Sequence, residues 1–507
     1  MRCDQKFYLH AWHHIEKRNT MRSNLNLLFN PEGVAVIGAS NNPAKVGGMT
    51  LLSIVSGGFK GEIYPINQRE EEIFGFRAYK NVKDVPRKID LAVICVPASS
   101  VKDVLRECVE KGVKFGVIIS SGFGEAGGEG RALEREAVKI ANDGGMRIVG
   151  PNCMGMANSD IKLYALMNML IPKEGKVSIV SQSGTLGSLT MALASDQGVG
   201  FNKFASSGNE ADLHAEDFIE YFAQDPKTEV ILVFIEGLRD GRKFLKVANE
   251  ATGNKPLVIL KGGITEEGAK AASSHTGSMA GSAPIYEAAF KQTGVIRAFD
   301  GEDLIDLAKG FALLPLPKGR RVGMVSAWGG IAVLASDSCA RHGLKFPELS
   351  KDAMEKLDNL LPPFWSRRNP IDITSAGIYG SWEIFIETTE LLLRDDGIDA
   401  VICMIPIFTP IFTSAFSRTT QYKDYTENVL QFTEEMEREF MKDFIRLRGY
   451  GKPLIVLSFF EGRESESVKT LEENGIPVYR TPEKAAHVLS MLAKYKEYLT
   501  DLDVKSR

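Results

Sequence analysis

The chain has 507 residues, of which 61 are Lys or Arg and 65 are Asp or Glu, giving a formal net charge of -4. At about 100 to 200 residues per domain, this length predicts about three globular domains. The charge is balanced and lacks a long block of one sign, which excludes the basic surface of a nucleic-acid-binding protein. No apolar run approaches the roughly 18 residues of a membrane-spanning helix, so we expect no membrane association.

The N-terminal segment, residues 1–24, differs in composition from the rest of the chain. It carries basic residues around the sequence HAWHH and lacks the apolar region of a secretory signal, so we expect a disordered leader. No cysteine or carboxylate cluster accompanies its histidines, and no metal site is expected. The six cysteines are scattered without a CxxC pair, which favours a reducing, cytoplasmic setting.

From Val34 onward, short apolar runs alternate with helical stretches. This pattern is typical of parallel sheets covered by helices on both faces. The runs form three sets: VAVIG, LAVICVP and FGVIIS; then VSIVS, VILVFIEG and PLVILKGG; then VGMVSAW, DAVICMIP and PLIVLSFF. The sequence therefore predicts an α/β protein with three doubly wound domains.

An internal sequence repeat supports this division into domains. VSIVSQSG at 177–184 recurs as VGMVSAWG at 322–329, and each is followed by a small-residue helix that contains ASD. The segment from Leu313 to Gly319 contains two prolines and is predicted to be a linker. We predict domains at 25–150, 151–314 and 315–507.

The first predicted strand ends in GASNNPAKVGG, a loop of small and polar residues that leads into a helix. Backbone N–H groups at a helix N-terminus attract anions, so this loop predicts a phosphate-bearing ligand. The dinucleotide fingerprint GxGxxG is absent after Gly38. The second strand, GEIYPIN, is followed by Gln68 and Arg69 rather than by the carboxylate of an NAD site.

Four segments in order, GASNNPAKVGG, YPIN, VICVPASS and VGPNCMG, resemble the CoA-binding domain of the succinyl-CoA synthetase superfamily, in particular that of ADP-forming acyl-CoA (acetate-CoA) synthetases. The resemblance implies a Rossmann-like CoA-binding domain followed by two flavodoxin-like ligase domains. It places the contacts to CoA or acyl-CoA on Gly38, Ser40, Asn41, Asn42, Pro43, Lys45, Val96, Pro97 and Ala98. The family sequence PVNP reads PINQ here, which weakens the case for a role of Asn67. A doubly wound domain without a ligand and an NAD site remain the alternatives.

The segment VSIVSQSGTLGS predicts a strand, a polar turn and a helix that begins near Gly184, which makes a second anion site. We expect phosphate to bind at Ser183, Gly184 and Thr185. The segment is not a nucleophile elbow, because GxSxG requires glycine at the position of Ser181.

His275 lies among small and polar residues in AKAASSHTGSMAGS. A neutral imidazole attacks phosphorus readily and also leaves readily, so His275 is a candidate phosphoryl carrier. From the residues alone, a surface or packing histidine is an equal alternative. SSHTGSMAGS resembles the phosphohistidine loop of the same family, which implies phosphorylation of His275 in a loop with Ser274, Thr276 and Gly277. The resemblance also implies that Glu236, which follows an apolar strand, holds the histidine ring.

The third predicted domain contains NPIDITSAG at 369–377 and resembles the additional ligase-like domain of these synthetases. We find no catalytic constellation in it and expect an interfacial role. The chain also lacks a GxxxxGK[ST] loop. The resemblance therefore implies that an ATP-grasp β subunit binds ADP or ATP with Mg²⁺, with α2β2 as the expected assembly.

Together these features predict the α subunit of an acid-thiol ligase. The implied reversible reaction converts acyl-CoA, phosphate and ADP into a carboxylic acid, CoA and ATP through an acyl phosphate and a phosphohistidine. A non-catalytic CoA-binding scaffold and an NAD-dependent oxidoreductase are the alternatives from other classes. The sequence does not identify the acid, although the extra domain disfavours succinate.

Overall fold

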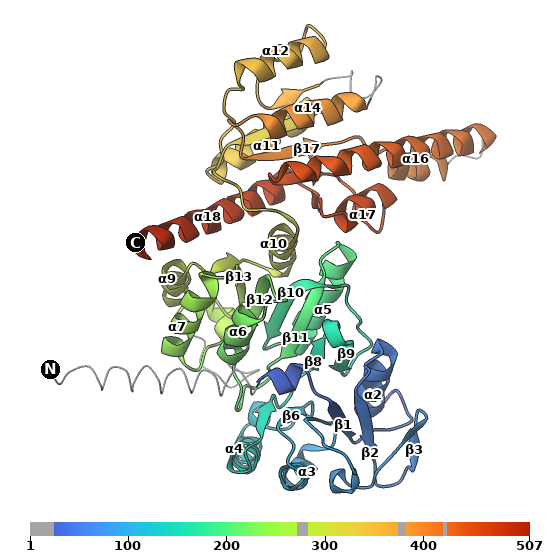
Figure 1. The fold of residues 1–507 in the computed structure, drawn as a ribbon, viewed down its shortest axis with the longest axis vertical. Helices are drawn as coiled ribbons and strands as arrows, with labels where there is room; N and C mark the ends of the chain where they lie inside the picture. The colour runs from blue at the N-terminus through green and yellow to red at the C-terminus, as the bar shows by residue number, and fades with distance from the viewer. Residues whose placement is uncertain (1–24, 271–281, 374–381, 419–422, 507) are drawn as a thin grey trace, which may run out of the picture. The chain divides into compact units, whose positions relative to one another are not determined.

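The computed structural model describes residues 25–270, 282–373, 382–418 and 423–506 (Figure 1). The chain divides into two compact units, one of residues 1–192 and 200–301 and the other of residues 193–199 and 302–507. The predicted leader and the predicted phosphohistidine loop lie outside the described residues.

The first sheet belongs to the first unit and has five parallel strands in the order β2-β1-β5-β6-β7. Ile37 of β1 pairs with Ile66 on one side and with Ile94 on the other. The chain order therefore reverses between β1 and β5, where a ligand crevice forms in doubly wound sheets. The strands are β1 (Gly33–Ile37), β2 (Glu62–Ile66), β5 (Leu91–Ile94), β6 (Phe115–Ile118) and β7 (Arg147–Val149), with the hairpin β3 (Glu72–Ile73) and β4 (Phe76–Arg77).

Helices cover both faces of this sheet. They are α2 (Val46–Gly57), α3 (Ala98–Lys111) and α4 (Gly128–Asp143), with the short helices η1 (Val82–Asp84) and η2 (Gly124–Ala126). Alternate residues of β1 enter two different hydrophobic clusters: Val34 and Val36 join one, and Ala35 and Ile37 join the other. Burial on both faces explains why the strand sequences are continuously apolar rather than alternating.

The second sheet also belongs to the first unit and has seven strands in the order β14-β13-β12-β10-β11-β8-β9. The strands from β14 to β11 are parallel, and β8 and β9 are antiparallel additions at one edge. The strands are β8 (Gly155–Asn158), β9 (Leu163–Leu166), β10 (Glu174–Ser181), β11 (Phe201–Ser206), β12 (Val230–Ile235), β13 (Leu257–Lys261) and β14 (Ile296–Ala298). The associated helices are η3 (Ser159–Ile161), α5 (Gly184–Asp196), α6 (Ala215–Gln224), α7 (Gly241–Thr252) and α9 (Ala283–Thr293).

The two sheets of the first unit share one hydrophobic core. A single cluster contains Val36 and Leu51 from the first sheet and its helix α2, and Ala165, Phe218 and Val233 from the second sheet and α6. The end of α2 packs closely on β9, because a Cβ atom on Gly57 would lie 2.3 Å from the ring of Tyr164. The first unit is therefore built as one packed body.

The third sheet belongs to the second unit and has five parallel strands in the order β16-β15-β17-β18-β19. The strands are β15 (Val322–Ser326), β16 (Ile371–Asp372), β17 (Ala400–Met404), β18 (Leu454–Leu457) and β19 (Val478–Tyr479). The helices of this unit are α10 (Gly301–Leu313), α11 (Gly329–Arg341), α12 (Lys351–Leu360), α14 (Glu383–Arg394), α15 (Thr409–Phe416), α16 (Lys423–Ile445), η4 (Arg446–Tyr450), α17 (Glu466–Glu473) and α18 (Pro482–Ser506).

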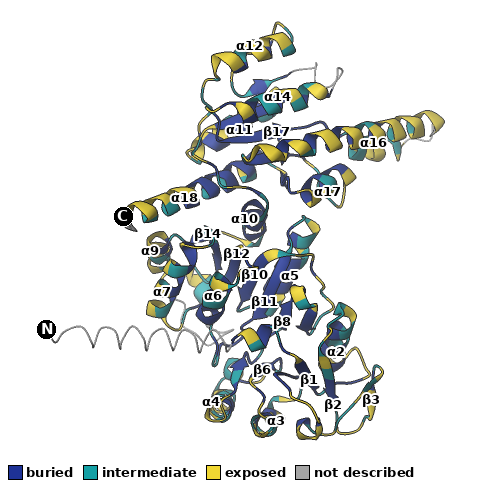
Figure 2. Ribbon diagram, viewed as in Figure 1, coloured by how far each residue is buried: buried dark blue, intermediate teal, exposed yellow. Residues whose placement is uncertain are grey.

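The five parallel strands follow the same order in all three sheets: the first strand of each set lies between the second and the third. This order explains the internal sequence repeat, because VSIVS forms β10 and VGMVS forms β15, and each of these is the first strand of its set. The prediction of three doubly wound α/β domains is confirmed. Figure 2 shows the strands buried and the exposed residues concentrated on helices and loops.

The described residues contain neither a membrane-spanning helix nor a metal-binding cluster. No helix among them is long and apolar enough to cross a membrane. Their five cysteines are free thiols. Within the same ranges, no group of three or more His, Cys, Asp or Glu side chains is arranged to hold a metal ion.

Candidate active site

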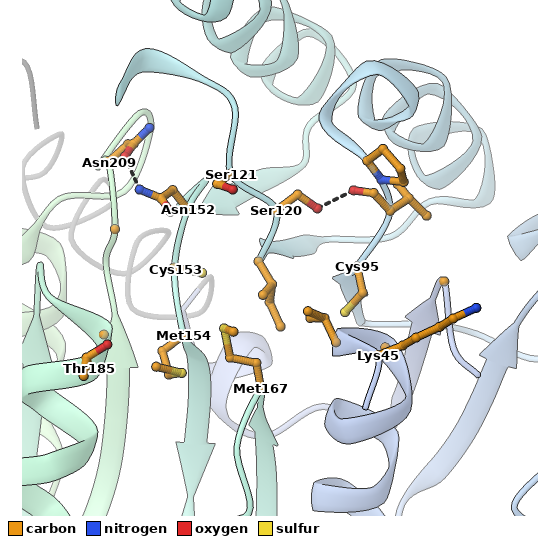
Figure 3. Close-up of a pocket in the computed structure, with 18 of the residues that line it drawn as sticks. Lys45, Cys95, Ser120, Ser121, Asn152, Cys153, Met154, Met167, Thr185 and Asn209 are labelled. Carbon is orange, nitrogen blue, oxygen red and sulfur yellow. Dashed lines mark hydrogen bonds between the residues drawn. The ribbon is translucent and has the colours of Figure 1, made fainter. Parts of the chain in front are cut away.

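A cavity of about 720 Å³ lies at the carboxyl ends of the strands of the first unit (Figure 3). One part of it opens at the turns after β1, β5 and β6, where the chain order of the first sheet reverses. Another part reaches the turns after β10 and β11 in the second sheet. The lining segments include 44–47, 95–97, 119–121, 152–154, 182–185 and 208–209.

The glycine-rich loop after β1 is packed directly against the start of α2. A Cβ atom on Gly47 would lie 2.0 Å from the carbonyl oxygen of Gly38, so only glycine permits this approach. Lys45 precedes the helix as its N-cap residue and lines the cavity. The backbone N–H groups of the first turn of α2 therefore lie beside the cavity, as the sequence predicts for an anion site.

The polar side chains of this loop bond within the protein. Ser40 Oγ accepts a hydrogen bond from the N–H of Asn42 at 3.1 Å, and Asn42 Oδ1 accepts one from Ala44 at 2.9 Å. Asn41 donates to the carbonyl of Glu72 at 2.9 Å and accepts from Phe74 at 3.0 Å. These bonds shape the loop and tie it to the β3–β4 hairpin.

The turn after β5 forms the facing wall. Val96 and Pro97 line the cavity, and Pro97 is the residue directly before α3. Ser120 Oγ, after β6, donates a hydrogen bond to the carbonyl of Val96 (Figure 3). Of the residues predicted to contact CoA, the cavity lining contains Gly38, Lys45, Val96 and Pro97, whereas Ser40, Asn41, Asn42, Pro43 and Ala98 lie outside it.

The predicted phosphate site lies at the other part of the same cavity. Ser183, Gly184 and Thr185 all line it, and α5 begins at Gly184. Ser183 Oγ accepts a hydrogen bond from the N–H of Leu186 at 3.3 Å, which caps the helix. A Cβ atom on Gly184 would lie 2.5 Å from the Cβ of Met154, so this turn packs tightly on the segment before β8.

Gln182 joins the phosphate turn to the segment that carries Glu236. Its Oε1 accepts hydrogen bonds from the N–H of Glu236 at 2.5 Å and of Gly237 at 3.2 Å. Its Nε2 donates to the carbonyl of Gly237 at 2.8 Å. Because β10 and β12 are neighbours, the side chain at the end of one strand holds the turn at the end of the other.

Lys261 holds the same segment from the opposite side. It is the last residue of β13, is 4% exposed and donates to the carbonyl of Glu236 at 2.8 Å. Its ammonium also lies 4.7 Å from the ring centre of Tyr286. Burial lowers the pKa of Lys261, while the nearby charge of Glu236 opposes this shift.

A buried carboxyl lies behind the phosphate turn. Glu210 is 3% exposed and accepts hydrogen bonds from Ser207 Oγ at 2.8 Å and from the N–H of Ala215 at 3.0 Å. Burial raises the pKa of Glu210 to about 7, and the nearby Glu216 contributes in the same direction. Glu210 therefore titrates near neutral pH.

Several residues of the cavity were missed from the sequence. These are chiefly Cys95, Ser120, Ser121, Asn152, Cys153, Met154, Met167, Gln182 and Asn209. Burial raises the pKa values of both Cys95 and Cys153 to about 12, so neither thiol is a nucleophile at neutral pH. Four of the missed residues lie in the motifs VGPNCMG and SQSG. Their place within these two motifs is the sequence signal that could have identified them as cavity residues. The predicted carrier His275, with Ser274, Thr276 and Gly277, lies outside the described residues.

Family models match most of the chain. A CoA binding domain matches residues 32–159, a succinyl-CoA ligase like flavodoxin domain matches residues 174–311, and a ligase-CoA domain matches residues 322–499. These assignments agree with the resemblance inferred from the short motifs.

The chain is similar over most of its length to known ligases. It is 41% identical over 476 residues to the alpha subunit of acetate–CoA ligase (ADP-forming) II of Pyrococcus furiosus, covering 93% of this chain and 98% of that subunit. It is 40% identical over 466 residues to acetate–CoA ligase (ADP-forming) of Methanocaldococcus jannaschii, covering 92% of this chain and 62% of that protein.

A solved structure with the same fold is that of dinucleotide forming acetyl-coenzyme A synthetase 1 of Ca. Korarchaeum cryptofilum in complex with phosphate and ADP. The TM-score is 0.83 at 35% identity, over 94% of this chain and 98% of that chain. From the identity, the coverage and the three domain matches together, this chain belongs to the family of ADP-forming acetate–CoA ligase α subunits, acid-thiol ligases within the succinyl-CoA synthetase superfamily.

Proposed function

We propose that this chain converts acyl-CoA and phosphate into a carboxylic acid and CoA, and carries the phosphoryl group on His275 toward ADP. One observation carries the proposal: a single cavity connects the strand-end crevice of the first sheet with the turn that opens α5. A CoA thioester bound at the first place would bring its carbonyl carbon toward phosphate bound at the second.

The chemistry proceeds in two transfers. A phosphate oxygen attacks the thioester carbonyl carbon, the C–S bond breaks, and CoA leaves as its thiolate to give an acyl phosphate. The imidazole of His275 then attacks phosphorus, the bond between phosphorus and the acyl oxygen breaks, and the carboxylate leaves. Backbone N–H groups at the start of α5 would offset the charge on the phosphoryl oxygens during both steps.

Glu236 is proposed to accept a hydrogen bond from the other ring nitrogen of His275. That contact fixes the tautomer and stabilises the charged ring as the phosphoryl group departs. The support is positional: Glu236 follows β12, whose carboxyl end lies beside that of β10, and Gln182 joins the two strand ends. A carboxylate there lies close to the phosphate turn.

The nucleotide half of the reaction is assigned to a partner. The related proteins named as alpha subunits match this chain along nearly their whole length, whereas the match covers only 62% of the relative from Methanocaldococcus jannaschii. We propose an ATP-grasp β subunit in an α2β2 assembly. That subunit would bind ADP with Mg²⁺ and take the phosphoryl group from His275.

Acetate is the first acid to test, because it appears in the names of the related ligases. The experiment incubates the purified chain with acetyl-CoA and radiolabelled phosphate, with and without a candidate β subunit. We expect label on the chain that resists base and is lost in acid, the behaviour of phosphohistidine. His275→Ala is expected to abolish this label, and His342→Ala serves as a matched control because His342 belongs to the second unit and is not among the residues that line the cavity.

Equal labelling of the native chain and His275→Ala would contradict the assignment of the carrier. No label with any of several acyl-CoAs, even with the partner present, would instead support a non-catalytic CoA-binding protein. Addition of ADP and partner to the labelled chain is expected to discharge the label into ATP.

A further inference from the structure

Lysines flank β13 at both of its ends, and each of them bonds to backbone carbonyls. Lys255, two residues before the strand, donates to the carbonyl of Phe222 at 2.8 Å and to that of Asp225. Lys261, the last residue of the strand, donates to the carbonyl of Glu236 at 2.8 Å and to that of the following glycine. Burial lowers the pKa of both side chains. Only Lys261 lies at the carboxyl end of the strand, where the turns after β10 and β12 also lie.

Lys261 differs in its neighbours from the two other buried lysines of the described residues. Lys203 and Lys309 each form an ion pair with a carboxylate, with N···O distances of 2.6 Å and 3.1 Å. The ammonium of Lys261 instead contacts two carbonyl oxygens and lies 4.7 Å from the ring centre of Tyr286, and the residue is 4% exposed. Lysine is rarely buried to this degree unless its charge is balanced. A charge elsewhere in the first unit therefore has to balance that of Lys261.

Glu236 is the group that balances this charge. Arg297 of β14 and Glu287 of α9 border the same small space as the Lys261 side chain, but they form an ion pair with each other. The carboxylate of Glu236, on the turn after β12, is the nearby charge that acts on the Lys261 ammonium. In an interior from which water is excluded, such an attraction is stronger than at the same distance in solvent.

We infer that Lys261 is a positioning residue for phosphoryl transfer, which fixes the turn that carries Glu236 and balances the charge of its carboxylate. The inference rests on the proposed function, in which Glu236 accepts a hydrogen bond from His275. The N–H of Glu236 is bonded to Gln182 and its carbonyl to Lys261, so the two neighbouring strands hold both backbone polar groups of this residue. Loss of Lys261 frees the carbonyl and leaves the carboxylate without its counter-charge.

The consequence is expected in the transfer step rather than in the binding of acyl-CoA. Lys261 is not among the residues that line the cavity, so its replacement leaves the walls of the cavity in place. A displacement of a reacting group by about 1 Å costs about a hundredfold in rate. An interaction that is needed only during transfer lowers kcat and leaves KM unchanged.

The test uses the complete enzyme assembled with its β partner, with acetyl-CoA and phosphate as substrates. Lys261→Met keeps most of the length of the side chain and removes its charge and its donors. We expect kcat for release of the CoA thiol to fall about a hundredfold, while KM for acetyl-CoA stays within about twofold of the native value. The single-turnover rate of acid-labile phosphate formation on this chain should fall by the same factor.

Lys255→Met is the matched control, because it removes a lysine that bonds two backbone carbonyls at the other end of the same strand. It should lower the free energy of unfolding in urea, as Lys261→Met does, and keep the native rate of label formation. Lys261→Gln decides the question if Lys261→Met does not fold. It keeps an N–H donor but removes the charge, and label formation should slow about tenfold or more.

A double-variant cycle tests whether Lys261 acts through Glu236. Glu236→Gln alone is expected to remove most of the label formation. Adding Lys261→Met to Glu236→Gln should then lower the remaining rate by no more than about threefold, because residues that act as a unit are not additive.

The outcomes separate this inference from the function on which it rests. If the native enzyme forms the acid-labile label but Lys261→Met and Lys261→Gln keep the native rate, the role of Lys261 is wrong and the proposed function stands. An equal loss of label in Lys255→Met, or losses that multiply in the double variant, would overturn the inference in the same way. Absence of acid-labile label on the native chain with every acyl-CoA would overturn both.

Discussion

Replacing Gln182 by alanine removes the carboxamide that connects the phosphate turn with the turn carrying Glu236. The change deletes two hydrogen bonds accepted from Glu236 and Gly237 and one donated to Gly237. At about 1 kcal/mol net for each hydrogen bond, the loss of stability has an upper value of about 3 kcal/mol. Because Gln182 lines the cavity, water can replace part of this, and we expect a loss of about 1 to 3 kcal/mol.

The larger effect is expected on phosphoryl transfer. If Gln182 positions Glu236, its loss lets the carboxylate move, and a misplacement of about 1 Å costs about a hundredfold in rate. The assay follows formation of acid-labile phosphate on the chain in a single turnover, alongside urea unfolding. Acyl-CoA binding is measured in parallel and is expected to remain, because the first loop and the β5 turn are untouched.

Gln182→Met is the matched control, since it keeps the side-chain volume and removes the hydrogen bonds. Both variants should lose phosphohistidine formation, whereas only the alanine variant also opens space. Native rates of label formation and native stability in both variants would refute a positioning role for Gln182. Loss of acyl-CoA binding together with the label would indicate general damage to the first unit.

Three further predictions concern other parts of the fold. Gly47→Ala brings a Cβ atom to 2.0 Å from a carbonyl oxygen of the loop after β1, so the CoA affinity measured by calorimetry should fall about tenfold or more. Gly128→Ala is the control, because its Cβ atom meets no atom within 4 Å, and this variant should keep the native CoA affinity. Glu210 has its pKa raised from 4.5 to about 7, so its stabilising contribution is complete below pH 4.5 and is lost as the pH rises through about 7. The melting temperature of the native chain minus that of Glu210→Gln should therefore fall between pH 5 and pH 8, and a constant difference would contradict the shift. In the native chain the Lys309 ammonium lies 3.1 Å from the buried carboxylate of Glu472, and Lys309→Met leaves that carboxylate without its cation. The free energy of unfolding of the second unit, measured in urea, should therefore fall by about 3 to 5 kcal/mol. An unchanged free energy of unfolding would contradict the need for this ion pair.

The central strands were predictable because they are buried on both faces, so β1, β5, β12 and β17 read as continuous apolar runs. The same logic failed for β11, whose sequence FNKFAS contains Asn202 and Lys203. Both are buried, and Lys203 Nζ bonds to Asp225 at 2.6 Å while Asn202 bonds to it at 3.0 Å. A strand that buries charge looks like a loop until its distant partner is known.

The residues of the candidate site also fall into a group that the sequence could predict and a group that it could not. Val96 and Ser183 lie just after the ends of β5 and β10, and Lys45 lies in the loop after β1, directly before α2. Their placement at the cavity could therefore be foreseen from the order of strands and turns. Asn41 was predicted to contact CoA, but its side chain is occupied by the β3–β4 hairpin, some thirty residues further along the chain. Met167 reaches the cavity only because β9 adds to the second sheet in antiparallel orientation, which no local pattern indicates.

The core shared by the two sheets of the first unit has a thermodynamic consequence. Residues such as Leu51 of α2 and Ala165 of β9 belong to one hydrophobic cluster. Unfolding of the first sheet would therefore remove hydrophobic contacts that stabilise the second sheet. The two halves of the cavity should therefore unfold cooperatively. A ligand at a hundred times its dissociation constant adds about 2.7 kcal/mol of stability to whatever unfolds with its site. CoA bound at one sheet thus helps to keep the phosphate turn of the other in its native arrangement.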